Sequence, residues 1–568
     1  MKIEEGPFIN RQSELAFFKQ KALEIAQGRG EDLLLISPQG RGKTALLKEL
    51  KEILFWGGGG VIPVYFTFSR DYQDLLDFAE EYLVSVISQI LLFEKKELIA
   101  TPKDIPLSFS DLQREAEKQG KAIIDEVILS HREACRIRDE RKGFINALAA
   151  PKRIAQAVNK PIWMLVDHIQ GLGAFAITGK GAAGLWREMM ASPWAPHLFS
   201  GEPPGFLLKT LHPALGSTNM AVMELTPLPA EEGKELAIVL GKFYKIEIAG
   251  DLIKSWFFYL EGNPGTLTAL LREARLEAPG LESHQRFVEI YLKSLWQGEL
   301  SRWFENRLYE RKGVDPLHGG YLLRILSQLL KSGQPMLPLT DLYRSIALPA
   351  KMVQPLVGIL ERAGVIWERF GNIGLENSRV LRDWVEVLVR KYLHQQDLAQ
   401  IITGRGKEIE RTLSKLKEEE EAPFPTSENT LHFSLVLPIN SESELVAVRA
   451  LEQMATYSDL DGASIEKVKI ALIEACINAA EHSQSFEKKI RVYFTVQPEL
   501  IEIVVEDRGQ AFDPVEVQAR IIREADPLSQ KRGRGLGLIR EMMDEVRFEK
   551  ADIGTRLYMV KKKSNERV

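Results

Sequence analysis

The sequence has very little cysteine and no long apolar run. Cys135 and Cys476 are the two cysteines among 568 residues, too few for a disulfide framework, so we expect a protein of the reducing cytoplasm. No stretch approaches the roughly 20 apolar residues that a membrane-spanning helix needs. The acidic start MKIEEGPFIN also lacks the basic and then apolar pattern of a signal peptide. We therefore expect a soluble chain without a membrane partner.

A strong excess of one charge is also lacking. Lys and Arg number 74 against 79 Asp and Glu, a net charge of -5, so nothing general draws the chain to nucleic acid. No repeat with a period of about 20 to 50 residues is visible, which argues against a solenoid. The chain has an ordinary globular composition, with 45% hydrophobic and 27% charged residues, and its length requires several domains.

A strand, a short glycine-containing loop and a helix follow one another near the N-terminus. The apolar run DLLLIS has strand length, and KTALLKELKEIL begins an amphipathic helix. Between them, Gly40, Gly42, Lys43 and Thr44 fit the P-loop pattern G-x-x-x-x-G-K-[ST]. In that geometry backbone amides cradle the phosphates, Lys43 reaches the β- and γ-phosphates and Thr44 binds Mg²⁺. Ser37 replaces the first glycine, so the loop must begin in a conformation that tolerates a side chain.

A second buried-strand run, PIWMLVDH, ends in Asp167 and His168. An acid at this place is typical of the residue that holds Mg²⁺ beside a P-loop, so we expect Asp167 to share the metal with Thr44. The pair of motifs resembles the P-loop ATPases of the archaeal-type signal-transduction (STAND) group, which is related to the AAA+ proteins. Three further segments resemble motifs of that group, namely FINRQSEL at 8–15, VMELTPLPAEEGKELA at 222–237 and GNP at 262–264.

The family usually has a glutamate where this chain has His168. That glutamate orients the attacking water, so the resemblance implies ATP binding but leaves hydrolysis at the P-loop doubtful. A histidine here is either a base or a packed or capping residue. SGE at 200–202 follows a short apolar run and is interpreted as the sensor position on the next strand.

Changes in pattern predict an α/β multidomain chain. Three helical segments followed by the hairpin-like VIWERFGNIGLEN at 365–377 are the outline of a winged helix. Lys and Arg number ten against six acids within 316–395, so we expect this winged helix to make an intramolecular or protein contact in preference to DNA binding. Two prolines beside a charge run mark a linker. The predicted units are a P-loop ATPase core (1–230, with a helical insertion of undefined role at about 94–160), a helical lid (231–315), a winged-helix-like domain with further helices (316–414), a linker (415–430) and a C-terminal domain (431–568).

The C-terminal domain contains a polar ladder and a second glycine-rich loop. SIEKVKIALIEACINAAEHS reads as a helix with Glu474, Asn478 and His482 on one face. Solvent exposure alone explains such a ladder, but the elements that follow favour a site. Two strands come next, then the loop RGRGLG before a helix, then a hairpin. The motif residues in chain order are Glu474 and Asn478, Asp507 and Gly509, Gly533 with Gly535 and Gly537, and Gly554 with Thr555.

This order resembles the GHKL (Bergerat) ATP-binding fold, an α/β sandwich, over residues 431–563. The compact length and the N-A-x-x-H run look most like the anti-sigma-factor serine/threonine kinases. The resemblance implies that Asp507, Gly509 and Thr555 contact adenine, that the glycine loop contacts the phosphates, and that Asn478 binds Mg²⁺. Glu474 is then the candidate general base. Ala511 replaces a second glycine that the family usually has.

Two functions follow from these resemblances. The first is a cytoplasmic regulator in which a P-loop switch module governs a kinase that phosphorylates a small antagonist protein. The second is a nucleotide-gated assembly protein without protein-kinase activity. Both use ATP and Mg²⁺. A sigma factor or a STAS-type antagonist is the expected partner, and an oligomer is compatible with either function.

Overall fold

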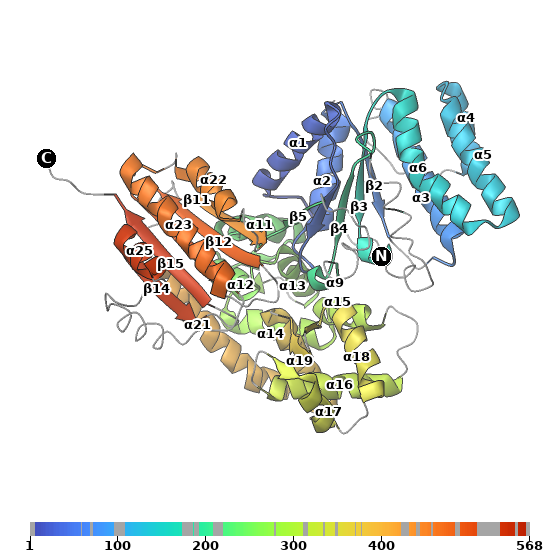
Figure 1. The fold of residues 1–568 in the computed structure, drawn as a ribbon. Helices are drawn as coiled ribbons and strands as arrows, with labels where there is room; N and C mark the ends of the chain where they lie inside the picture. The colour runs from blue at the N-terminus through green and yellow to red at the C-terminus, as the bar shows by residue number, and fades with distance from the viewer. Residues whose placement is uncertain are drawn as a thin grey trace. The chain divides into compact units, whose positions relative to one another are not determined.

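The structure is a computed structural model that divides into two compact units, Met1–Glu421 and Ala422–Val568. We call them unit 1 and unit 2 and treat each by itself (Figure 1). The structure describes residues 6–57, 60–68, 72–95, 108–172, 186, 192–207, 220–277, 280–309, 316–332, 336–346, 350–369, 371–376, 378–421, 431–438, 443–455, 458–482, 489–507, 534–550 and 555–563.

Unit 1 begins with a five-stranded parallel sheet. The P-loop strand β1 lies between β4 and β5, and the strand order is β2-β3-β4-β1-β5. Four of the five strands are buried along most of their length, as expected of a parallel sheet that is covered on both faces. The strands are β1 (Leu33–Ile36), β2 (Ile62–Thr67), β3 (Ile162–Asp167), β4 (His197–Gly201) and β5 (Ala221–Glu224).

Helices pack on both faces of this sheet (Figure 1). Alternate residues of β1 enter different cores: Leu33 and Leu35 pack with α1 and α2, whereas Leu34 and Ile36 pack with the helices between β2 and β3. The helices on the first face are α1 (Gln12–Ala26) and α2 (Lys43–Trp56). Those between β2 and β3 are α3 (Leu75–Glu94), α4 (Phe109–Lys118), α5 (Ala122–Ile137) and α6 (Glu140–Val158).

The rest of unit 1 is mainly helical and has one continuous apolar core. Two small sheets accompany the helices, a parallel pair β6-β7 and a three-stranded sheet in the order β8-β10-β9. The elements after the main sheet are α11 (Ala230–Tyr244), β6 (Glu247–Ile248), α12 (Ile253–Tyr259), α13 (Pro264–Glu277), β7 (Gly280–Leu281), α14 (His284–Gln297) and α15 (Glu299–Tyr309). They continue as α16 (Pro316–Lys331), β8 (Leu337–Pro338), α17 (Leu339–Ile346), α18 (Ala350–Arg362), β9 (Ile366–Arg369), β10 (Asn372–Leu375), α19 (Arg379–Tyr392), α20 (Leu398–Ile401), a π-helical turn η4 (Ile402–Gly406) and α21 (Lys407–Glu421).

Unit 2 is an antiparallel sheet covered by helices. Every strand pair is antiparallel, in the order β11-β12-β13-β15-β14. Alternate residues of β12 and β13 are buried against the helices, whereas Tyr493 on the other face is exposed. The elements are β11 (Leu431–Pro438), α22 (Ser443–Ala455), α23 (Gly462–His482), β12 (Lys489–Gln497), β13 (Leu500–Asp507), α25 (Arg534–Met542), β14 (Glu545–Lys550) and β15 (Thr555–Lys562).

The strands and helices expected around both glycine loops are confirmed. β1, α2 and β3 occupy the segments read as strand, helix and strand in the first half. In unit 2 the ladder helix, the paired strands and the final hairpin form as expected. Residues 415–421, the first part of the segment interpreted as a linker, continue α21 because glutamate and lysine favour helix.

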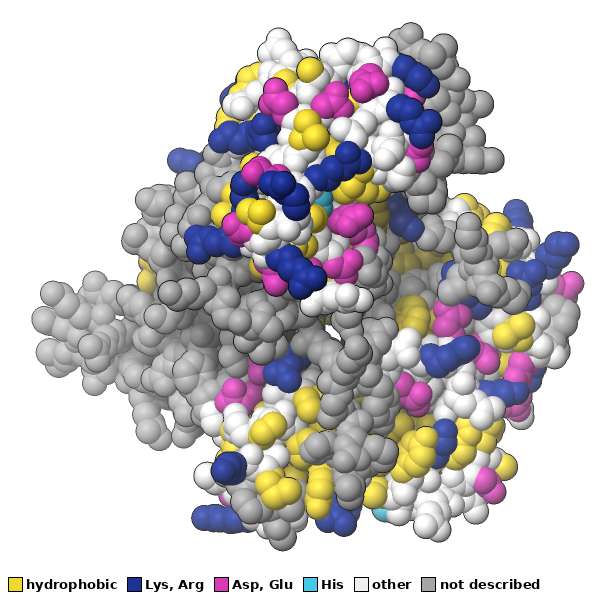
Figure 2. Space-filling view, turned by 90° about the vertical axis from the view of Figure 1, so that its right-hand side faces the viewer, with side chains coloured by type: hydrophobic (Ala, Val, Ile, Leu, Met, Phe, Trp, Pro, Cys, Tyr) yellow, Lys and Arg dark blue, Asp and Glu magenta, His cyan; other side chains and the backbone are white. Residues whose placement is uncertain are grey.

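The described surface carries charges of both signs. Figure 2 shows Lys and Arg side chains interspersed with Asp and Glu on one face, the arrangement of a solvated surface. Both cysteines are free thiols. Within the described residues no helix combines the length and the apolar character that crossing a membrane requires.

Candidate functional site

The first glycine loop joins the end of β1 to the start of α2. Gly40 and Gly42 have φ of 81° and 94°, values that residues with a side chain rarely adopt. Gly42 precedes the first residue of α2, so the chain turns there and directs the first amides of the helix toward the loop. Ser37 is buried and is absent from the described residues of positive φ, which explains why a side chain is tolerated at that position.

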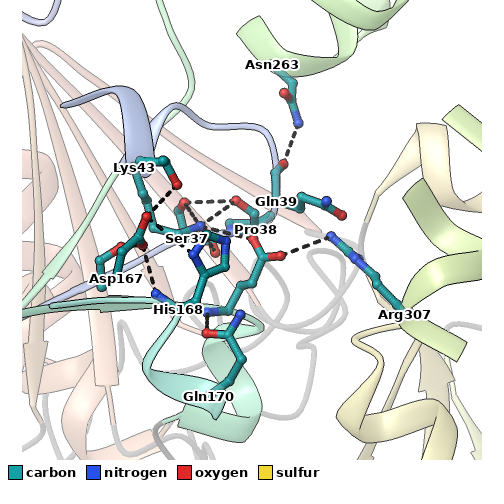
Figure 3. Close-up of polar contacts among 12 residues, drawn as sticks. Ser37, Pro38, Gln39, Lys43, Asp167, His168, Gln170, Asn263 and Arg307 are labelled. Carbon is teal, nitrogen blue, oxygen red and sulfur yellow. Dashed lines mark hydrogen bonds and ion pairs between the residues drawn. The ribbon is translucent and has the colours of Figure 1, made fainter. Parts of the chain in front are cut away.

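Lys43 points back into this loop (Figure 3). Its ammonium donates to the carbonyl and hydroxyl oxygens of Ser37 at 2.9 Å each and to the carbonyl of Pro38 at 3.1 Å. A fourth contact, to Glu202 Oε2, is longer at 3.3 Å. Burial lowers the pKa of Lys43, and the Glu202 carboxylate opposes that shift. The side chain predicted to bind phosphate therefore lies at the loop, with its protons engaged by oxygen atoms.

Asp167 is the centre of a hydrogen-bond network at the end of β3. It is 1% exposed and accepts from the hydroxyls of Thr44 at 2.6 Å, Tyr65 at 3.1 Å and Ser200 at 2.9 Å. The structure thus brings together Thr44 and Asp167, the two residues expected to share a metal. Their hydroxyl and carboxylate oxygens are the hard ligands that Mg²⁺ takes. Ser200 belongs to the SGE segment that was interpreted as the sensor position. Tyr65 was missed by the sequence reasoning, because a tyrosine in a strand carries no signal of its own.

His168 follows Asp167 in a left-handed conformation with φ of 55°. Its Nδ1 lies 3.1 Å from Thr67 Oγ1 and 3.4 Å from Asp167 Oδ2, and its side chain is 43% exposed. It is therefore not a core residue. The contacts occupy Nδ1, so any base role would fall to Nε2.

The GNP motif at 262–264, where α13 begins, contacts the loop. Asn263 Nδ2 donates to the Gln39 carbonyl at 2.8 Å, and the Gly265 amide donates to the Gly40 carbonyl at 2.8 Å. A Cβ on Gly40 would lie 2.4 Å from Asn263 Oδ1, so the close approach itself requires glycine. The FINRQSEL segment reaches the same place, because Arg11 donates to the Arg41 carbonyl at 3.1 Å. In the sequence, the P-loop, the GNP motif and the FINRQSEL segment were three separate resemblances to one family. In the folded chain they are in contact.

A cavity of about 100 Å³ opens beside the loop. Pro38, Gln39 and Arg41 line one side of it and Glu202, at the end of β4, another. Arg307 of α15 also lines it, and its guanidinium points toward the loop residues in Figure 3. SGE at 200–202 had marked the β4 end as a sensor position, whereas nothing in the sequence singled out Arg307.

In unit 2 the polar ladder lies on α23. Glu474 and Asn478 are half-buried one turn apart, and Asn478 Nδ2 is buried with no hydrogen-bond partner among the described residues. Asp507 and Thr555 are directly opposite each other in the register of β13 and β15. Gly535 and Gly537 lie in the first turn of α25, which packs beside α23.

Part of the expected site falls outside the described residues. Gly509, Ala511, Gly533 and Gly554 do so, as do the side chains of His482, Asp507 and Thr555. What is described fits a nucleotide in both units. In unit 1 the cradle excludes a Cβ and the Thr44 and Asp167 oxygens suit Mg²⁺. In unit 2 the buried Asn478 Nδ2 has no hydrogen-bond partner among the described residues, so it is able to donate to a ligand.

Comparison with known proteins identifies the C-terminal part. The sequence model of the "Histidine kinase-like ATPase domain" matches residues 439–561. The serine-protein kinase RsbW of Bacillus licheniformis is 38% identical over 111 residues, 18% of this chain and 68% of that protein. Through unit 2, this chain belongs to the histidine kinase-like ATPase family. The RsbW of Bacillus subtilis (strain 168) is 30% identical over 147 residues, 25% of this chain and 91% of that protein. The present chain also has, in unit 1, the arrangement of strands, loop and acid that is typical of a P-loop protein.

Solved structures resemble the chain only distantly. The Walker-type ATPase PABY2304 of Pyrococcus abyssi has a TM-score of 0.42 at 14% identity, covering 67% of this chain and 96% of that one. The Aeropyrum pernix ORC1 protein, solved in complex with DNA, has a TM-score of 0.37 at 14% identity, covering 68% and 94%. The P-loop assignment of unit 1 therefore rests on its own geometry.

Proposed function

We propose that unit 2 is an ATP-dependent serine/threonine protein kinase of the anti-sigma-factor type and that unit 1 is a nucleotide-responsive switch that governs it. The observation that carries the proposal is the pair Glu474 and Asn478 on α23, in a domain related to serine-protein kinases. The orphaned Asn478 amide marks where a ligand completes the site. The phosphate acceptor is a small antagonist protein, and the setting is the cytoplasm.

The roles of the residues in unit 2 follow from their chemistry. Asn478 offers a neutral oxygen to Mg²⁺, which when bound neutralises charge on the phosphates. Glu474, one turn earlier, takes the proton from the serine or threonine hydroxyl as it attacks. Asp507 and Thr555, neighbours across two strands, hold the adenine together with Gly509. Gly533, Gly535 and Gly537 give backbone amides to the phosphates, which the N-terminus of α25 also favours.

Unit 1 contributes a second nucleotide site. Lys43 and the loop amides with Gly40 and Gly42 hold the phosphates, and Thr44 with Asp167 holds Mg²⁺. The three-stranded sheet β8-β10-β9 with α16, α17 and α18 supports the winged-helix module that we propose for this part of unit 1. Because it shares one core with the lid that docks on the loop, a change at the nucleotide reaches it through packed contacts. It serves as an intramolecular or protein contact.

A second function is favoured by His168. An exposed histidine occupies the position after the strand acid where the family usually has a glutamate. ATP would then be bound at both sites to hold conformations of an assembly, with no phosphate passed to a protein. The two functions differ in whether a phosphorylated protein is formed.

The test of the first function is phosphate transfer by the full chain. Radiolabelled ATP with Mg²⁺ is incubated with small antagonist proteins of the STAS type, and labelled protein is counted. We expect Glu474→Gln to lower the transfer rate by about 100-fold or more, as loss of a general base does, while ATP affinity stays within about threefold. Asn478→Ala is the matched variant that removes ATP binding as well.

Phosphate release without acceptor distinguishes the alternative. If the full chain releases phosphate, Lys43→Ala abolishes that release and no antagonist becomes labelled, the activity belongs to unit 1 and the kinase proposal is wrong. If transfer occurs and Glu474→Gln leaves it unchanged, the catalytic assignment is wrong.

A further inference from the structure

The contacts of Lys43 leave little room for a phosphate in the arrangement described. An ammonium has three protons, and four oxygen atoms surround this one. Three of the four belong to the loop itself. The fourth, Glu202 Oε2, is the most distant at 3.3 Å and also the only carboxylate. A phosphate oxygen carries the same charge and the same acceptor chemistry as this carboxylate.

Glu202 is held beside Lys43, where its carboxylate competes with a phosphate for the ammonium. It follows β4, and its amide donates to Gln170 Oε1 at 3.1 Å. Its second carboxylate oxygen lies 3.9 Å from Arg307 Nη2, so one side chain bridges two cations. Glu202 and Arg307 both border the cavity beside the loop. The side chain is 18% exposed, which leaves it a path toward solvent.

Arg307 is a poorly compensated cation. A guanidinium carries five donors, yet among the described residues Arg307 makes no hydrogen bond. Its recorded contacts are the ion pair with Glu202 at 3.9 Å and the ring of Phe304 at 5.6 Å. Its side chain is 20% exposed, and burial lowers its pKa more than Glu202 and Glu376 raise it. A partly buried guanidinium whose one carboxylate partner is distant is stabilised when a further anion is supplied.

We propose that Glu202 is a placeholder for nucleotide phosphate at Lys43, and that a bound nucleotide displaces it while Arg307 of α15 becomes a second cationic ligand of the phosphates. The inference rests on the proposed nucleotide site of unit 1. It gives a role to Glu202 of the SGE segment and adds Arg307, which no motif predicts. The planar fork of arginine suits two phosphate oxygens at once. The cavity with Trp303 at its wall is where the phosphates and Arg307 meet.

Through this exchange, nucleotide binding at the loop would affect the small sheet β8-β10-β9. The same cavity is lined by Gly364 and Glu376, which flank β9 and β10 of the small sheet. When Arg307 turns from Glu202 to a phosphate, α15 is tied to the loop through the ligand. The position of the small sheet then depends on occupancy of the site.

The test measures ATP binding to unit 1 alone in the full chain. Asn478→Ala silences unit 2, and isothermal titration with ATP and Mg²⁺ gives the affinity. Tryptophan fluorescence gives an independent reading, because Trp303 borders the cavity and all nine tryptophans lie before residue 422. Lys43→Ala in the same background defines zero binding.

We expect Glu202→Gln, which keeps the shape and removes the competing charge, to bind ATP about tenfold more tightly. Arg307→Ala is expected to bind about tenfold more weakly, the loss of one charge-assisted contact. Arg302→Ala, an exposed arginine on the same helix, is the control and should leave the affinity unchanged. Thermal unfolding followed by tryptophan fluorescence checks that each variant is folded.

Unchanged or weaker binding in Glu202→Gln overturns the placeholder role. Unchanged binding in Arg307→Ala overturns the role of Arg307 as a second ligand of the phosphates. Either result leaves the nucleotide site of unit 1 valid as long as Lys43→Ala abolishes the heat of binding. If the Asn478→Ala chain gives no heat even with Lys43 present, the nucleotide function of unit 1 fails and this inference fails with it.

Discussion

Single residues at the first loop are constrained by space as well as by charge. Gly40 combines a φ of 81° with an approach by Asn263 that leaves no room for a Cβ. Gly120, at the end of α4, has a φ of 66° but nothing within 4 Å of its would-be Cβ. An alanine at Gly120 would suffer only the strain of a positive φ, whereas an alanine at Gly40 would also clash with Asn263. A comparison of the two substitutions therefore separates backbone strain from crowding.

We predict that Gly40→Ala destabilises unit 1 more than Gly120→Ala does. Positive φ costs an alanine about 1–2 kcal/mol at either site, and the clash with Asn263 adds about 1–3 kcal/mol at Gly40. Urea unfolding followed by tryptophan fluorescence measures both. ATP binding to unit 1 should also weaken in Gly40→Ala alone, because displacement of Asn263 loosens the lid. Equal stability losses in the two variants would mean that the crowding is relieved without cost.

Elements far apart in the chain are joined by one buried carboxylate. Asp383 of α19 is 1% exposed and accepts from Tyr259 of α12 at 2.7 Å and Tyr291 of α14 at 2.9 Å. Arg405 in the π-helical turn η4 donates to its other oxygen at 2.7 Å. Burial acts to lower the pKa of Arg405, but Asp383 outweighs it and the pKa is raised. This cluster fixes the turn that precedes α21, the last helix before unit 2.

We predict that Asp383→Ala destabilises unit 1 by about 3–5 kcal/mol, because it removes the buried partner of Arg405 and leaves two buried hydroxyls unpaired. Glu408→Ala removes another carboxylate partner of Arg405, but that one is 57% exposed, so its loss costs less than about 1 kcal/mol. Urea unfolding of the full chain, read by tryptophan fluorescence, compares the two. Similar losses for both variants would contradict a dominant role of the buried partner.

At the scale of the whole molecule, each unit has its own apolar core. Each also has its own residue type for following unfolding, tryptophan in unit 1 and a buried cysteine in unit 2. The apolar clusters of unit 1 and unit 2 share no residue. All nine tryptophans belong to unit 1, and Cys476 is buried in the core of unit 2. Burial raises the pKa of this thiol from 9.0 to about 12. Since the folded pKa is the higher one, the neutral thiol favours the folded unit below about pH 9 and this contribution is lost as the pH rises toward 12.

We predict that ATP with Mg²⁺ protects the two units through separate sites. In a Cys135→Ser chain, thiol labelling at pH 8 follows opening of unit 2, while tryptophan fluorescence follows unit 1. Saturation at about 100 times Kd stabilises each by about 2.7 kcal/mol. Lys43→Ala should remove only the fluorescence shift and Asn478→Ala only the labelling protection. Loss of both effects in one variant would show that a single site controls the whole chain.

Local patterns predicted more of the fold than of the site. The runs DLLLIS and PIWMLVDH became β1 and β3, because a buried strand in a parallel sheet is apolar throughout. The two strands expected after the ladder helix likewise became β12 and β13. The contact of Thr44 with Asp167 was expected from the P-loop motif and the strand acid, although β4 lies between β1 and β3 in the sheet. Asn263 was noticed as a motif, but its hydrogen bond to the loop depends on how the lid packs.

What the sequence determined by itself is therefore the chemistry of each element: two glycine loops, a strand acid, and a helix that bears Glu474 and Asn478. Spacing along the chain fixes these, because helix and strand periods are local. Only the tertiary structure decided which distant side chains complete the first site. Tyr65, Glu202 and Arg307 reach it from β2, β4 and α15, and such meetings are set by the packing of whole elements, which no short stretch of sequence encodes.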